Sequence, residues 1–131
     1  MIGLDTNVLV RYLMQDDPVQ SPRATAFIEQ RLGAAEPGFI SVVAMAETAW
    51  VLERSYGLSA AEIATAIERT LQIDRFLVER EQEVFTAMIT LREGGGSFAD
   101  ALIAEFGQRA GCERTVTFDR KGLRLPGFEP L

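Results

Sequence analysis

The residues best suited to chemistry in this sequence are four carboxylates that stand far apart along the chain: Asp5, Glu47, Asp100 and Asp119. Carboxylate oxygens are the ligands that hard divalent cations such as Mg²⁺ and Mn²⁺ prefer. Such a cation makes a bound water easier to deprotonate and offsets the negative charge that grows on a phosphodiester during hydrolysis. If the fold gathers these four side chains, the sequence predicts metal-dependent phosphodiester chemistry.

The remaining composition narrows the choice of reaction. The chain has no histidine, which excludes Ser-His-Asp catalysis, histidine-based nucleases and most zinc sites. The formal net charge is −6, with 12 arginines and the single lysine Lys121, which argues against a protein that grips nucleic acid over a broad basic surface. It fits a protein that binds a cation or a basic partner.

Two of the four carboxylates follow predicted strands. Asp5 comes after the apolar segment Ile2–Leu4, and it also suits the N-cap of the following helix. Asp119 comes after Thr115–Phe118, and it also suits the first position of a type I turn that ends at Gly122. Each position therefore has an ordinary structural interpretation beside the functional one.

Glu47 lies in a predicted helix of unusually apolar composition that begins after Ser41. At helical spacing Val43, Ala46 and Trp50 share its face, so we expect this face, and Trp50 in particular, to be buried. A buried carboxylate is costly unless a cation, a proton or a hydrogen-bond donor meets it. The alternative is that Glu47 occupies a single exposed position on the helix.

Asp100 comes three residues after Ser97 at the start of a predicted helix over Phe98–Arg109. This spacing also suits a capping box, in which the Asp100 carboxylate would accept a hydrogen bond from the Ser97 backbone. The small residues Ala104 and Gly107 leave room on the same helix face.

The elements that must position these side chains alternate between strand and helix, which predicts a single α/β domain over residues 1–131. We expect a parallel sheet of about five strands with helices on both faces, and ligands gather at the carboxyl ends of such strands. The predicted strands are 2–4, 39–40, 76–78, 115–118 and a short edge strand within 122–131; the predicted helices are 6–14, 22–32, 42–54, 60–71, 80–92 and 98–109.

Four motifs in order resemble PIN-domain nucleases, and most closely the VapC-type toxins of bacterial toxin–antitoxin pairs. They are Leu-Asp-Thr-Asn-Val-Leu-Val at the start, Ser-Val-Val-Ala-Met-Ala-Glu, Phe-Ala-Asp-Ala-Leu-Ile-Ala and Thr-Phe-Asp. The resemblance implies a PIN fold and a Mg²⁺- or Mn²⁺-dependent endoribonuclease acting on structured RNA such as tRNA or rRNA. It also implies a small antitoxin partner and a homodimer.

The resemblance assigns roles to particular residues. Asp5, Glu47, Asp100 and Asp119 match the acidic quartet that holds the metal, and Asn7 and Thr117 match polar positions beside it. Candidates for phosphate contacts, from the sequence itself, are Arg11, Arg120, Lys121 and Arg124. These basic residues also suit an ordinary solvated surface.

Other functions remain as alternatives. The nearest are an RNA-processing PIN nuclease without a toxin role and a PIN-like binding module without catalysis. A phosphatase of the haloacid dehalogenase type would need a second aspartate where Asn7 stands, and a phospho-acceptor domain would need a lysine placed differently from Lys121.

The cellular setting is an expectation from composition. The single cysteine, Cys112, fits a reducing compartment, and we see neither a signal peptide nor an apolar run long enough to span a membrane. We therefore expect a cytoplasmic protein.

Overall fold

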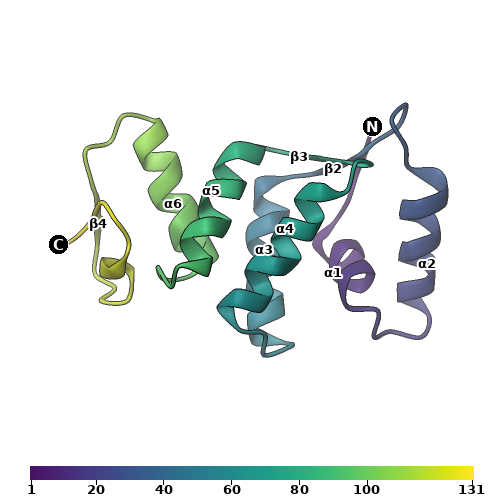
Figure 1. Cartoon of the computed structure of the whole chain (residues 1–131), viewed down its shortest axis with the longest axis horizontal. Helices are drawn as coiled ribbons and strands as arrows, with labels where there is room; N and C mark the ends of the chain where they lie inside the picture. Colours follow the sequence, from purple (N-terminus) through teal and green to yellow (C-terminus); the bar gives the residue numbers. More distant parts are fainter.

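The computed structural model describes all 131 residues as an elongated α/β molecule whose strands are short (Figure 1). The strands are β1 (Ile2–Gly3), β2 (Gly38–Ile40), β3 (Phe76–Val78), β4 (Thr115–Thr117) and β5 (Phe128–Pro130). The helices are α1 (Thr6–Met14), α2 (Gln20–Ala26), α3 (Val42–Arg54), α4 (Ala60–Gln72), α5 (Glu81–Arg92) and α6 (Phe98–Arg109), with a π-helical segment η1 (Phe27–Arg31) and a 3-10 turn η2 (Gly122–Arg124).

All strand pairs are parallel, but they form two sheets instead of one. The first sheet has the order β1-β2-β3, with Ile2 opposite Gly38 and Gly38 opposite Phe76. The second contains only β4 and β5, with Thr115 opposite Phe128. The predicted α/β class with parallel strands is confirmed, and the expected number of strands is present. The expected continuous sheet is divided into three strands and two.

The hydrophobic core lies mainly beside the three-stranded sheet and between the helices. Ile40 at the end of β2 is fully buried, as are Met45 and Leu52 on α3 and Met88 on α5. Gly38 allows this packing because a side chain there would meet Leu32 at 2.7 Å. Local signals in the sequence account for the helix ends: Ser41, Ser59 and Ser97 each cap the helix that follows.

The second face of the three-stranded sheet is poorly covered. Gly3 and Leu77 on this face are exposed, with Leu77 47% exposed, and Phe39 is half-buried. Parallel sheets are ordinarily covered on both faces. The expectation of helices on both faces therefore holds only incompletely within one chain.

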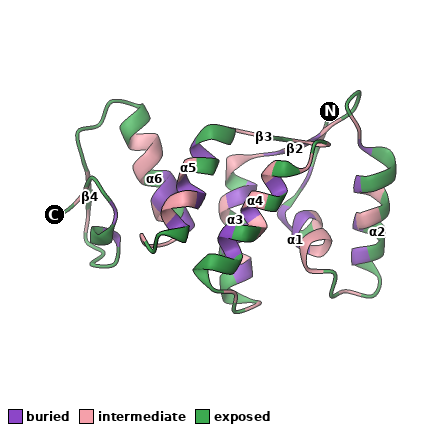
Figure 2. Ribbon diagram, viewed as in Figure 1, coloured by how far each residue is buried: buried purple, intermediate pink, exposed green.

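The α3 face that carries Glu47 is exposed, contrary to the sequence prediction. Trp50 is 56% exposed, Val43 and Glu47 are exposed, and the Arg54 guanidinium lies 5.5 Å from the Trp50 ring centre. The ribbon coloured by burial shows α3 among the central helices of the molecule (Figure 2). The apolar composition of α3 misled the prediction because the helix buries its opposite face, with Met45, Thr48 and Leu52, in the core.

The C-terminal strands lie at one end of the long axis, and β1 lies towards the other end (Figure 1). Between them stand α3, α4, α5 and α6, of which α5 packs against both α4 and α6. None of these helices combines the length and the apolar character that a membrane crossing requires.

Candidate active site

Asp5 and Glu47 lie in one pocket at the carboxyl end of β1. Asp5 is the N-cap of α1, and its Oδ1 atom accepts a hydrogen bond from the Thr6 backbone at 2.8 Å. The structural interpretation of Asp5 is thus correct, but it occupies only one carboxylate oxygen. Asn7 on α1 and Glu47 on α3 line the same pocket, which has a volume of 450 Å³. We call this the Asp5 pocket.

The wall of the Asp5 pocket is a network that sequence reasoning did not place there. Arg11 donates through Nη1 to the Tyr56 hydroxyl at 3.1 Å and through Nε to Gln20 at 2.8 Å. Its guanidinium also lies 3.7 Å from Asp16. Burial, followed by the hydrogen bond to Asp16, raises the pKa of Tyr56, so its hydroxyl stays protonated. Arg11 is therefore largely occupied by protein partners, which reduces its capacity for a phosphate.

Asp100 has no partner in its own helix cap. Ser97 accepts a hydrogen bond from the Asp100 backbone at 3.1 Å, but the reciprocal bond from the Ser97 backbone to the Asp100 carboxylate is missing. The chain contains a matched example that does form both bonds, the capping box of Ser59 and Glu62. The capping-box alternative for Asp100 is wrong, and its half-buried carboxylate is free for another role.

Asp119 is fixed by its own turn. Its Oδ1 atom accepts a hydrogen bond from the Lys121 backbone at 2.9 Å, and Gly122 donates to the Asp119 carbonyl at 3.2 Å, as expected for a turn that ends at this glycine. The Thr117 hydroxyl accepts from the Asp119 backbone at 2.9 Å. Thr117 therefore orients Asp119.

Asp100 and Asp119 line a second pocket, of 610 Å³, which we call the Asp100 pocket. Lys121 and Arg124 bring positive charge to its wall, and Trp50 of α3 contributes an exposed ring. Arg120 is exposed but does not line the pocket. A basic group beside two carboxylates suits the binding of a phosphate close to a cation.

Helix α3 separates the two pockets, which share no lining residue. Glu47, Val51 and Ser55 face the Asp5 pocket, whereas Ala46 and Trp50 face the Asp100 pocket. No three acidic side chains lie close enough to share a metal ion within one chain. The structure brings the predicted residues together as two pairs and does not unite the pairs.

Comparison with known proteins supplies the family. The sequence matches the PIN domain over residues 2–127. No curated protein matches the sequence. The match spans both pockets and the strands β1 to β4, and it agrees with the parallel strands and six helices of the structure. The chain therefore belongs to the PIN domain family, whose members are generally nucleases that use divalent metals.

Proposed function

We propose that this protein is a metal-dependent endoribonuclease and the toxin of a toxin–antitoxin pair. The observation that carries the proposal is the Asp100 carboxylate, which is half-buried in a pocket with Asp119 and has no hydrogen-bond donor within its own helix cap. A carboxylate in this setting has oxygen atoms free to bind a cation.

The donor atoms fit a hard cation such as Mg²⁺ or Mn²⁺, because all four candidate ligands are carboxylates and the chain has no histidine. The candidate ligands are Asp5 and Glu47 in the Asp5 pocket and Asp100 and Asp119 in the Asp100 pocket. When bound, the cation would neutralise phosphate charge and lower the pKa of a coordinated water. The remaining residues would act on the substrate: Lys121 and Arg124 by contacting phosphate oxygens, and Thr117 by orienting Asp119.

RNA cleavage in Mg²⁺ or Mn²⁺ tests the nuclease proposal. We expect EDTA to reduce cleavage to background and added Mg²⁺ to restore it. We expect Asp100→Asn to lower the cleavage rate at least about 100-fold, because loss of outer-shell partners alone typically costs 10–100-fold at metal sites. The matched control is Asp74→Asn, an exposed aspartate on neither pocket wall, which should cleave like the wild type.

Cleavage that persists in EDTA or in Asp100→Asn would contradict the mechanism. Failure of the wild type to cleave any RNA, with Mn²⁺ bound, would favour a binding module without catalysis.

Expression in a bacterial host tests the toxin role. We expect growth arrest that a co-expressed small neighbouring gene relieves, since the net charge of −6 suits a basic partner. Asp100→Asn should not arrest growth. A host that grows normally with active nuclease present would point to an RNA-processing enzyme instead.

A further inference from the structure

We propose that two copies of this chain exchange their C-terminal elements, so that β4 of one copy joins β1 of the other and each active site takes Asp5 and Glu47 from one chain and Asp100 and Asp119 from its partner. This inference rests on the proposed function for the role of the site and for the choice of these two strand edges. The free edges and the exposed apolar side chains of β4 are separate observations.

Both β1 and β4 have a free edge. The backbone N–H groups of Ile2 and Leu4 donate to Pro37 and Phe39 on the β2 side, at 2.9 Å each, so the intervening Gly3 directs its N–H and carbonyl away from β2. In β4, Thr115 and Thr117 use their backbone groups towards β5, which leaves those of Val116 directed away. Unpaired edges of this kind are templates for another strand.

The positions of the acidic residues select these two edges among the four that are available. Asp5 follows β1 and Asp119 follows β4. A parallel β1–β4 pair that aligns Gly3 with Thr117 would place Asp5 beside Asp119, since adjacent strands lie about 4.8 Å apart. Joining β4 to the free edge of β3 would leave two further strands, β2 and β3, between Asp5 and Asp119.

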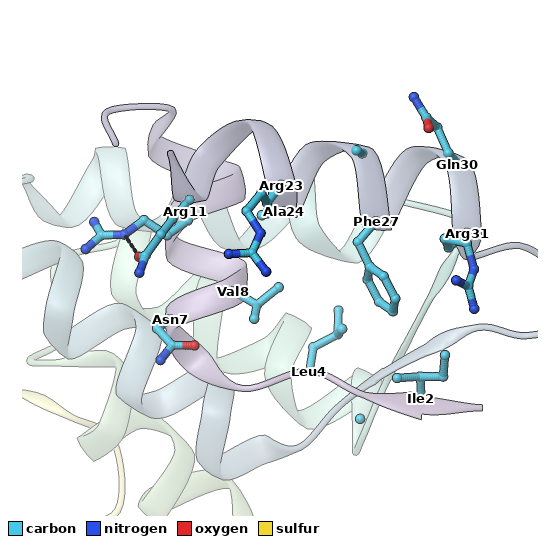
Figure 3. A pocket seen from close by; sticks show the side chains of 13 residues that line it. Ile2, Leu4, Asn7, Val8, Arg11, Arg23, Ala24, Phe27, Gln30 and Arg31 are labelled. Carbon is cyan, nitrogen blue, oxygen red and sulfur yellow. Dashed lines mark hydrogen bonds between the residues drawn. The ribbon is translucent and has the colours of Figure 1, made fainter. Parts of the chain in front are cut away.

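The surfaces on the two sides are complementary in chemistry. With this alignment, Val116 and Phe118 share the sheet face of Ile2 and Leu4, yet they are 51% and 85% exposed in the single chain. Beside β1 lies an open groove of 710 Å³, with Ile2, Leu4, Val8 and Phe27 along it and Arg23 and Arg31 at its rim (Figure 3). The apolar side chains of β4 suit this groove.

The opposite face of the proposed β1–β4 pair also has complementary surfaces. Thr115 and Thr117 of β4 lie on the α6 side, where Gly107 permits a close approach: a side chain at Gly107 would meet Thr115 at 3.2 Å. A partner's α6 would therefore come with its β4 to the poorly covered face that carries Gly3 and Leu77. Its exposed Ile103 offers an apolar contact there.

A second copy is the occupant, because the chain's own β4 is held elsewhere. The link from α6 to β4 is hydrogen-bonded back onto α6, with Cys112 donating to Gly107 at 2.9 Å, so β4 moves only with α6. Helix α6 packs on α3 and α5, and α5 buries Val84 and Met88. Closure within one chain would break this packing, whereas a reciprocal two-fold dimer would keep it.

Complementation between inactive variants tests the exchange. Asp5→Asn and Asp100→Asn chains carrying different affinity tags are co-expressed, and the mixed dimer is purified through both tags. One of its two sites would then contain four unaltered carboxylates, so we expect about half of the wild-type cleavage rate. The control pair, Asp5→Asn with Glu47→Gln, leaves a defect in both sites and should stay at background. Background activity in the first pair, with active wild type, would overturn the exchange and leave the nuclease proposal intact.

A second measurement does not depend on RNA cleavage. Gly3→Cys and Thr117→Cys are combined in a Cys112→Ser chain, because neighbouring strands bring Cα atoms within disulfide range. Exchange predicts a covalent dimer of twice the 14.5 kDa chain mass on oxidation. A disulfide within one chain, or none, would overturn the proposal even if the nuclease proposal also fails.

Exposed positions give the matched surface control. Phe118→Lys should convert the dimer to a monomer in sedimentation while leaving the helical circular dichroism unchanged, because this side chain makes little contact within its own chain. Val19→Lys, at another exposed apolar position that lies away from β1 and β4, should remain dimeric. A wild-type protein that sediments as an active monomer would contradict the proposal.

Discussion

The two sheets of this protein are built from strands of similar length but differ in how they are supported. The β1-β2-β3 sheet lies against a core of helices, and Ile40 and Val78 at the carboxyl ends of β2 and β3 are buried. The β4-β5 sheet contributes no buried strand residue, and only Gly122 and Leu125 are buried in the chain from Thr115 onwards. Two strands alone are marginal in water. The comparison predicts that the first sheet is stable within one chain, whereas the second needs further contacts to be equally stable.

Hydrogen exchange should reveal the largest difference between the two sheets. We expect the Ile40 amide to open only with global unfolding, which costs about 5–15 kcal/mol for a typical domain, and the Val116 amide to exchange almost freely in dilute protein. Protection of Val116 should rise with protein concentration if β4 pairs with a second copy. Strong protection of Val116 that is independent of concentration would show that the C-terminal sheet is stabilised within one chain.

Substitutions near the two sheets should also differ in their effect on the free energy of unfolding, but by a smaller amount. Met45→Ala removes a fully buried side chain of α3 and should lower the free energy of unfolding by about 2–5 kcal/mol, because it leaves a cavity. Leu123→Ala near β4 alters an exposed side chain and should change the free energy of unfolding by less than about 0.5 kcal/mol. Urea denaturation measures both, and equal effects would remove the distinction between the regions.

Removal of the helix cap at Ser97 has the smallest expected effect on stability. Ser97 begins α6, the helix that precedes β4. Ser97→Ala removes the hydrogen bond to the Asp100 backbone and should cost about 1 kcal/mol in thermal or urea unfolding. Ser97→Asp can still cap the helix and should restore most of this loss. If Ser97→Ala leaves stability unchanged, α6 is held by its packing on α3 and α5 alone.

Local signals made most of the secondary structure predictable. The helices that follow Ser41, Ser59 and Ser97 and the turn from Asp119 to Gly122 appear in the structure where the sequence predicts them, and each of these serines caps its helix. These features depend on residues a few positions apart, so a single sequence contains the information. The exposed Trp50 was not predictable in this way, because its burial depends on which face of α3 meets distant elements.

The candidate site likewise combines features that the sequence predicts with features that depend on tertiary packing. Residue type excluded histidine chemistry, because coordination preference is a property of the side chain, and position along the chain singled out four candidates among the 19 acidic residues. Tyr56 and Asp16 carried no such signal, and their place beside Asp5 follows from the packing of α1 against α3.

The sequence by itself determined the helices, the strands, their parallel class and the chemical nature of the candidate ligands, since each follows from local spacing or residue type. Only the tertiary structure decided that the strands form two sheets and that the carboxylates lie as two pairs on either side of α3. The physical reason is that sheet pairing and side-chain convergence depend on contacts between residues distant along the chain. Here the packing of α6 on α3 and α5 keeps β4 away from β1 of the same chain.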